Sequence, residues 1–176
     1  LIALVPLLSS VIGAAATLGL LAAGIVVYTY AEWKRSQGET VPIISRITMY
    51  ASRDRDRGHF VLGPVTLALG AMIALMLYPE PAASLAIYSL AFGDGIASIV
   101  GKLFGRIRIP ASGGKTVEGS AACFSAVFLA AFLILGSIPA ALAIALGAMI
   151  LEAAPTEDLD NLILPTGVGF LAILIV

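Results

Sequence analysis

The sequence predicts an all-α membrane protein, a polytopic bundle of about six transmembrane helices. Hydrophobic residues make up 60% of its 176 residues and charged residues only 12%, whereas soluble domains carry about 25% charged residues. Its apolar residues form long runs, without the two-residue alternation of a transmembrane β-strand. This composition excludes an ordinary soluble domain and a disordered tail. A net charge of −1 offers no basic face for nucleic acid, and one cysteine, Cys123, excludes a disulfide framework and a cysteine-rich zinc site.

A helix that crosses a bilayer needs about 20 apolar residues. The apolar runs predict spans at 2–31, 61–78, 82–103, 117–135, 139–152 and 162–176, within a single integral-membrane domain over residues 1–176. The first run is long enough to tilt or to extend past the bilayer, and the fifth is too short to span comfortably. The first run has no charged start and is too long for a signal peptide.

The basic residues predict the topology. Every Lys and Arg lies either between the first and second spans or between the third and fourth: Lys34, Arg35, Arg46, Arg53, Arg55, Arg57, Lys102, Arg106, Arg108 and Lys115. Two crossings separate these segments, so both lie on one side, and the positive-inside rule makes that side cytoplasmic. The acidic turn at 157–160 returns to the same side. A transporter with a midplane site more often shows inverted repeats, and we find no repeat here.

A carboxylate lies inside the third apolar span, at Asp94. An intramembrane carboxylate is costly, so it predicts a functional site. On a helix, Asp94, Ser98, Gly101 and Gly105 share one face. This face of small residues admits either a phosphate chain or a closely packed neighbouring helix, and the glycines alone do not decide between the two.

The segment 109–120 contains the sequence Gly-Gly-Lys-Thr, which invites comparison with a P-loop. The spacing fails, because position 109 is Ile where that motif requires Gly. The local chemistry still favours an anion, since Lys115 brings a charge and Thr116 opens a helix whose free N–H groups attract phosphate. Glu118 enters the first turn of that helix, where it either holds a metal or complements the helix dipole.

A third cluster of carboxylates lies between the last two spans. Three of its polar residues adjoin the apolar runs: Glu152, Asp160 and Asn161. Glu157 and Asp158 lie in the middle of the turn, where we expect them to be solvated. Carboxylate and amide oxygens suit a hard cation, above all Mg²⁺.

The depth of two carboxylates predicts a cavity. Asp94 and Glu152 each lie twelve residues from the outer end of their span, which is about 18 Å at 1.5 Å per residue. Both would then lie on the order of 10 Å below the cytoplasmic surface of a core about 30 Å thick. We expect a cavity open to the cytoplasm, with these carboxylates at its floor around a shared Mg²⁺ and Lys115 at its rim.

The first cytoplasmic segment offers weaker candidates. Residues 41–48 are amphipathic enough to lie in the membrane interface, with Tyr30 and Trp33 as anchors. We expect Arg46 and Arg53 to lie within reach of a nucleotide and His59 to lie in the membrane interface.

These residues resemble a known family, the CTP-dependent lipid-alcohol kinases that include dolichol kinase, phytol kinase and CTP-dependent diacylglycerol kinase. Three motifs carry the resemblance, in this order: Gly93-Asp94-Gly95-x-Ala97 with Gly101 and Gly105; Lys115-Thr116-x-Glu118-Gly119-Ser120; and Glu152-x-x-Pro155 with Asp160-Asn161 and Pro165. The bacterial branch, described as polyprenol or phytol kinase-like, looks nearest. Members usually carry an Arg-Lys-x-x-His segment before the first span, and this chain does not show it.

The resemblance implies transfer of a phosphoryl group from CTP to the hydroxyl of a polyprenol, phytol or diacylglycerol, with Mg²⁺. Together with the residues above, it assigns catalysis to Asp94, Lys115 and Glu118 and metal binding to Asp94, Glu152 and Asp160. The nucleotide contacts are Gly93, Gly95, Ser98, Gly101, Lys102, Gly105, Lys115, Thr116 and Asn161. It also implies a bacterial inner-membrane enzyme with a cytoplasmic active site, and it leaves a homo-oligomer open.

Three alternatives remain beside this assignment. CDP-alcohol phosphotransferases need two further aspartates on the next helix, and here none follows Asp94 until Asp158. Phosphatidate cytidylyltransferases share an intramembrane Gly-Asp and a downstream lysine, but their Lys-Asp pair is Lys115-Thr116 here; they are the second choice among enzymes. A transporter or channel that uses Asp94 as its ion site is the non-enzymatic alternative.

Overall fold

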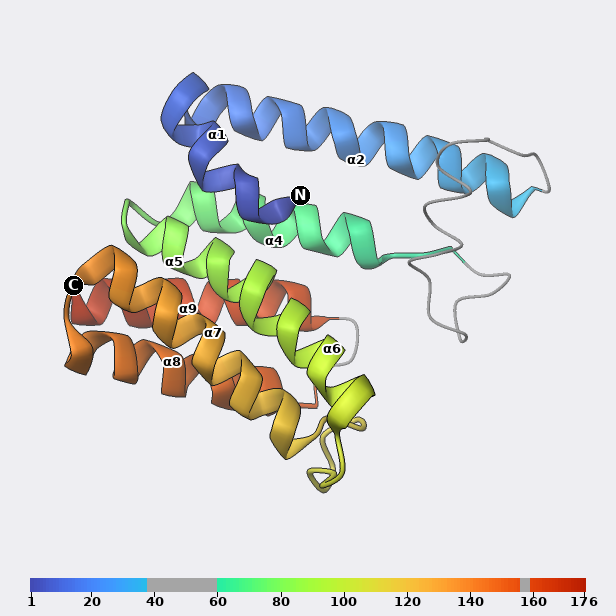
Figure 1. Cartoon of the computed structure of the whole chain (residues 1–176). Helices are drawn as coiled ribbons and strands as arrows, with labels where there is room; N and C mark the ends of the chain where they lie inside the picture. The colour runs from blue at the N-terminus through green and yellow to red at the C-terminus, as the bar shows by residue number, and fades with distance from the viewer. Residues whose placement is uncertain (38–59, 156–158) are drawn as a thin grey trace.

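The computed structural model describes residues 1–37, 60–155 and 159–176 and shows an all-α membrane helix bundle (Figure 1). Its helices are η1 (Ile2–Leu4), α1 (Val5–Ile12), α2 (Ala14–Ser36), α4 (Gly63–Leu77), α5 (Ala82–Tyr88), η3 (Ser89–Asp94), α6 (Gly95–Phe104), α7 (Val117–Leu135), α8 (Ile138–Ala153) and α9 (Asp160–Ile175). The predicted fold class is confirmed.

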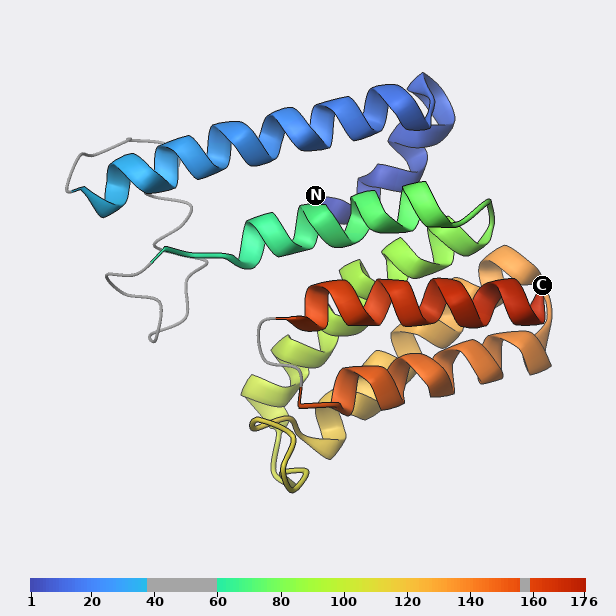
Figure 2. The same cartoon turned by 180° about the vertical axis from the view of Figure 1, so that it is seen from behind.

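The first apolar run is a helical hairpin. Gly13 ends α1 and precedes α2 with φ 84°, in the left-handed region that favours glycine. The chain therefore turns back, and α1 lies beside α2 in both views (Figures 1 and 2). The prediction of one continuous span over 2–31 is wrong.

The other predicted spans each correspond to a helix, with boundaries that differ by a few residues at most. Residues 82–104 run as one helical rod whose middle, η3, is a π-helix. By length and composition, Ala14–Arg35, Ala82–Phe104 and Val117–Leu135 can cross a membrane. Helix α8 has 16 residues, about 24 Å, which agrees with the expected shortness of the fifth span.

Small residues let the helices approach closely. The buried core is rich in alanine, including Ala74, Ala131 and Ala145, as is usual where membrane helices pack. Helix α9 packs against α4, α5 and α8, and two polar contacts fix it: Asn161 Nδ2 donates to Thr66 Oγ1 at 2.8 Å, and Tyr78 Oη donates to the Thr166 carbonyl at 2.6 Å. These contacts set the position of Asp160 at the start of α9.

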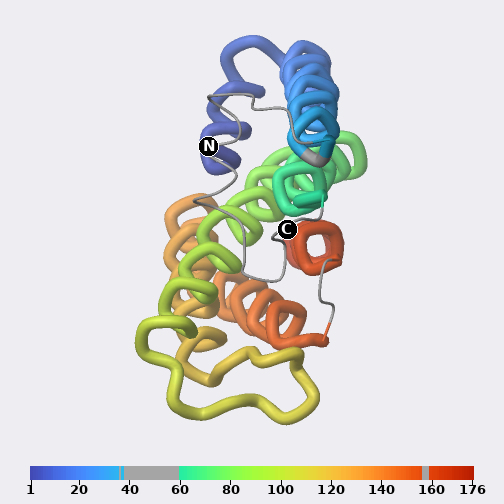
Figure 3. Tube along the Cα trace, turned by 90° about the vertical axis from the view of Figure 1, so that its right-hand side faces the viewer, coloured from blue at the N-terminus to red at the C-terminus, as the bar shows by residue number. Residues whose placement is uncertain are grey.

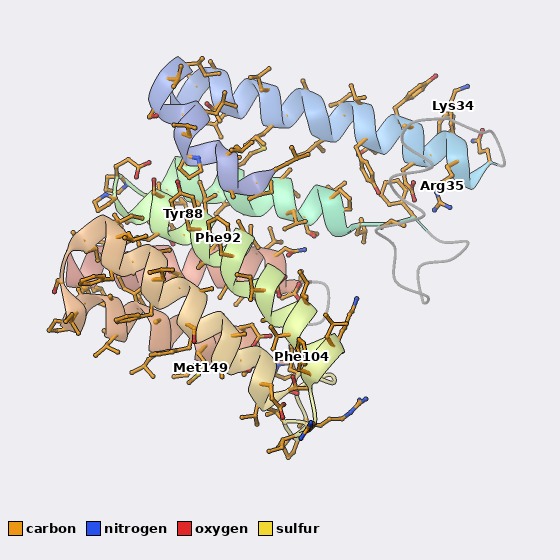
Figure 4. All side chains as sticks on the ribbon, viewed as in Figure 1. Lys34, Arg35, Tyr88, Phe92, Phe104 and Met149 are labelled. Carbon is orange, nitrogen blue, oxygen red and sulfur yellow. The ribbon has the colours of Figure 1, made fainter. Side chains whose placement is uncertain are left out.

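The polar ends of the helices gather at one end of the bundle. Lys34 and Arg35 at the end of α2 lie on the same side of the view as Phe104 at the end of α6 (Figure 4). The loop between α6 and α7 is found at this end too, where Figure 3 looks almost along the helix axes. This arrangement agrees with the predicted grouping of charge on one side.

The contact between α4 and α9 depends on Gly70. A Cβ at this position would collide with the backbone carbonyl of Asn161 and touch Pro165. We predict that Gly70→Ala lowers the free energy of unfolding by about 1–3 kcal/mol, as overpacking does, measured by thermal unfolding in detergent. The matched control is Gly24→Ala on α2, where an added Cβ meets nothing within 4 Å. Equal melting temperatures for the two variants would contradict this packing.

Candidate active site

The loop between α6 and α7 is a small hairpin that fixes Lys115. Arg108 and Thr116 form an antiparallel bridge, and Ile109 N donates to the Lys115 carbonyl at 2.9 Å. Gly113 and Gly114, with φ of 69° and 98°, make the turn at its tip. These backbone bonds fix the position from which the Lys115 side chain extends.

The base of this hairpin is pressed against α6. Thr116 caps α7 by accepting a hydrogen bond from Gly119 N at 3.1 Å. A Cβ on Gly101 or Gly119 would come within 3.1 Å of Thr116 Oγ1, and one on Gly105 would collide with the Gly101 carbonyl. The close-packing interpretation of these glycines is therefore supported, although Gly101, Gly105 and Gly119 also line the cavity described below.

The Lys115 ammonium is surrounded by carboxylates from three helical segments. Its Nζ lies 3.0 Å from Glu152 Oε1 on α8, 3.6 Å from Asp94 Oδ1 at the end of η3 and 3.7 Å from Asp160 Oδ2 at the start of α9. Oxygens this near one nitrogen are well under about 10 Å apart. All four residues are among the predicted site residues, and the structure brings them together.

Two further hydrogen bonds orient the carboxylates. Ser120 Oγ donates to Glu152 Oε2 at 2.8 Å, and the backbone N–H of Asn161 donates to Asp160 Oδ1 at 2.9 Å. Glu152 is 3% exposed. A buried carboxylate needs such partners, since an unpaired charge away from water is costly. Each oxygen of Glu152 therefore has its own donor.

The charge of Lys115 is stabilised by its neighbours. Burial alone would lower the pKa of the ammonium, but Glu152 above all, then Asp94 and Asp160, outweigh this effect and hold the pKa above its ordinary value. The stabilisation that this charge provides is therefore complete below the ordinary lysine pKa of about 10.4 and is lost only as the pH rises through the higher folded value.

A cavity of about 560 Å³ opens beside this cluster, within the range of about 300–1,000 Å³ for small-molecule sites. Three cationic side chains line it, Lys102, Arg108 and Lys115, and the remaining lining residues are Ala97, Ser98, Gly101, Gly105, Ser112, Gly113, Gly114, Thr116, Gly119, Glu152 and Asp160. A cavity lined by both basic groups and carboxylates suits a polyphosphate with its cation.

Four of the expected site residues lie elsewhere. Glu118 accepts hydrogen bonds from Ile107 N at 3.3 Å and anchors the hairpin outside this cavity. The Asn161 amide bonds Thr66, and neither Gly93 nor Gly95 lines the cavity. Gly93 instead permits close packing, since a Cβ there would come within 2.9 Å of Val127. Contacts of Glu118 and Asn161 indicate structural roles.

Other candidates are not placed. Arg46, Arg53, His59, Glu157 and Asp158 lie outside the described residues.

Sequence reasoning missed two contributors. Arg108 was counted only as a topology charge, yet it lines the cavity because the hairpin pairs it with Thr116. Ser120 belongs to the second motif and had no predicted role, yet its hydroxyl donates a hydrogen bond to Glu152. The signal for Arg108 was the Gly-Gly turn, which folds the segment before it back onto the segment after it.

A ready-made metal centre is not present in the described part of the chain: no three Asp, Glu, His or Cys side chains there are grouped as ligands around one point. The Lys115 ammonium instead takes the central position between the three carboxylates. These oxygens are nevertheless the donor type that Mg²⁺ prefers.

The fold and this site define a polytopic helical membrane protein with a lysine-centred carboxylate cluster at one end of its bundle. Its similarity to known proteins is partial. The chain is 28% identical over 142 residues to "Probable phytol kinase, chloroplastic" of Triticum aestivum, covering 70% of this chain and 47% of that protein. It is 37% identical over 81 residues to "Farnesol kinase, chloroplastic" of Arabidopsis thaliana, covering 45% of this chain and 26% of that protein. The chain thus spans half or less of these curated relatives. No family model matches it, and no solved structure gives a significant match.

The protonated, half-buried state of Lys115 can be tested with an amine-acylating reagent, which reacts only with the free base. At pH 8.5 we predict that Lys115 is acylated at least about tenfold more slowly than the exposed Lys102, measured by peptide mass spectrometry. Glu152→Gln should accelerate the reaction at Lys115 and leave Lys102 unchanged. Equal rates at both lysines in the unaltered chain would contradict the ion cluster.

Proposed function

We propose that this chain is the catalytic portion of a membrane kinase of the CTP-dependent lipid-alcohol kinase family. It would transfer the terminal phosphoryl group of CTP to the hydroxyl of an isoprenoid alcohol. The observation that carries the proposal is the position of Lys115 Nζ within 3.7 Å of carboxylates on three helical segments, at the edge of a cavity large enough for a nucleotide.

The phosphate chain has a suitable place in the cavity. Lys102, Arg108 and Lys115 supply positive charge, and the Gly113-Gly114 turn exposes backbone near them. The positive end of the dipole of α7, a helix of 19 residues, also favours a nearby anion. Transfer of a phosphoryl group depends mainly on such positioning and on neutralisation of charge.

The residues that would hold a Mg²⁺ ion are the three carboxylates beside Lys115: Asp94, Glu152 and Asp160. When bound, the ion would neutralise charge on the phosphates of the donor. The ammonium of Lys115 is on a flexible stem, so it can leave the centre of the cluster and reach a phosphate oxygen while the carboxylates hold the cation.

The reaction also needs an acceptor for the alcohol proton. As the alcohol oxygen bonds to the terminal phosphorus of CTP, the bond from that phosphorus to the oxygen of the departing CDP breaks, and the hydroxyl proton passes to a carboxylate. Asp94 and Glu152 both lie beside Lys115, and one of these two carboxylates would accept the proton.

The two substrates follow from different observations. The relatives are named for phytol and farnesol, so we take an isoprenoid alcohol as the acceptor, and the motif resemblance provides CTP as the donor. The positive-inside rule places the cavity on the cytoplasmic side, in a bacterial inner membrane if the bacterial branch is correct.

The decisive experiment incubates the purified chain, in nanodiscs, with labelled nucleoside triphosphates and with farnesol, phytol, a polyprenol or diacylglycerol. A kinase yields a phosphorylated alcohol and a nucleoside diphosphate. A cytidylyltransferase given phosphatidate yields a CDP-lipid and diphosphate, so thin-layer separation of the products distinguishes the second choice. Absence of any product with every pair would overturn the proposal.

We predict that Asp94→Asn and Glu152→Gln each lower turnover at least about 100-fold, the loss typical of a base or metal ligand. Folding should be retained, as checked by gel filtration in detergent. The matched control is Glu80→Gln, since Glu80 lies in the turn before α5, at the opposite end of the bundle. Residual activity above about one tenth in either site variant would remove that residue from the mechanism.

The cation site predicts a thermal response. Lys115→Gln leaves three carboxylates without their central positive charge, so its melting temperature should fall in the absence of divalent ions and recover with Mg²⁺ more than that of the unaltered chain. Addition of Asp94→Asn to this variant should reduce the recovery. Lys34→Gln, on α2 at the same end, is the control and should show no added response. Recovery by Mg²⁺ equal in all chains would contradict a shared ion.

A further inference from the structure

A second cavity lies at the end of the bundle that carries Lys115, on the surface of α7 and α8. It has a volume of about 420 Å³, and its walls are the first turns of α7 and the last turns of α8, with the segments that adjoin them. Its lining residues are Ile109, Val117, Ser120, Ala121, Met149, Ile150, Ala153 and Ala154. Helices α7 and α8 run side by side (Figures 1 and 2), and Met149 is labelled on α8 in Figure 4. We call this the α7–α8 groove.

The groove is built for an apolar occupant. All of its lining side chains are apolar except Ser120. Ile150 is 67% exposed and Val117 46% exposed, so the groove opens on the bundle surface that faces lipid in a membrane. An apolar chain can therefore reach it from the bilayer without passing through water.

Ser120 connects this groove to the charged cavity. Ser120 lines the groove, and its hydroxyl donates to Glu152 Oε2 at 2.8 Å, while Glu152 Oε1 lies 3.0 Å from Lys115 Nζ. Glu152 also lines the cavity of Lys102 and Arg108. Ser120 and Glu152, joined by one hydrogen bond, thus connect the apolar groove to the polar cavity.

We propose that the α7–α8 groove holds the hydrocarbon chain of the acceptor alcohol, with the hydroxyl at Ser120 and Glu152. This inference rests on the proposed function. The hydroxyl of the alcohol donates to Glu152 beside the Ser120 hydroxyl. The hydrocarbon chain of the alcohol extends along α7 and α8 into the lipid. The polar donor and the apolar acceptor then both reach Glu152, which brings the alcohol oxygen and the terminal phosphorus of the donor together.

The groove can be filled by mutation. Ala121→Phe and Ala153→Phe place a ring in it, so the KM for farnesol should rise at least about tenfold while the KM for the nucleotide stays within about twofold. The matched control is Ala143→Phe, an exposed position of α8 outside the groove, which should leave both constants unchanged. Gel filtration and melting temperature show whether each variant is folded.

A second measurement does not require turnover. A farnesol analogue with a diazirine near the end of its chain should cross-link to peptides that contain 117–121 or 149–154, and excess farnesol should compete. Labelling should be lost in Ala121→Phe and retained in Ala143→Phe. Cross-links elsewhere, or equal labelling by a diazirine phospholipid that farnesol does not displace, would overturn the groove as the alcohol site.

The two proposals fail separately. If the unaltered chain phosphorylates farnesol and the groove variants behave as Ala143→Phe does, the groove assignment is overturned and the kinase proposal is not. If no phosphorylated product forms with any alcohol, the kinase proposal is overturned, and displaceable cross-links in the groove still support an isoprenoid site.

Discussion

The site depends on a single electrostatic arrangement, in which one ammonium holds three carboxylates together near the edge of a membrane. Glu152 comes from α8, Asp94 from the end of η3 and Asp160 from the start of α9, and all three meet Lys115 Nζ. Without that charge, three acids in a partly buried place would repel one another, and removal of one partner of a buried ion pair costs roughly 3–5 kcal/mol. The loop that carries Lys115 therefore links the ends of helices that are far apart in the sequence.

Close helix packing makes this arrangement geometrically feasible. Gly101, Gly105 and Gly119 allow the start of α7 to lie against α6, and Gly70 allows α9 to lie against α4. Apolar side chains give little net attraction between helices in lipid, so close backbone contact and buried polar contacts take over that role. Gly101, Gly105 and Gly119 also line the cavity, so packing and ligand access are not independent. A side chain added at Gly101 would both separate the helices and narrow the cavity.

The sequence predicted the helices well because hydrophobicity alone sets where a chain can cross lipid. It missed the break at Gly13, since the flanking residues are apolar on both sides and no change in composition marks the turn. The meeting of Asp94 and Glu152 was predictable because depth in a bilayer follows from counting residues. The directions of Glu118 and Asn161 were not, because they depend on which neighbour each side chain meets: Ile107 N for one and Thr66 for the other. Arg108 required knowledge of the hairpin pairing, which hydropathy does not encode.

On the proposed function, Lys115 links cation binding to nucleotide binding. In the structure its ammonium takes the place that a divalent cation would occupy between the carboxylates. A cation that enters this place displaces the Lys115 ammonium. The nearest anionic partner for the displaced ammonium is the phosphate chain in the adjoining cavity. Cation and nucleotide would then favour each other's binding, because each provides what the other removes: the cation replaces Lys115 among the acids, and the phosphates receive Lys115. Such reciprocity is what linkage requires of two ligands that share one charged group. An enzyme built this way keeps a positive charge among its three carboxylates both before and after its donor arrives, and the acceptor alcohol meets the donor beside Glu152.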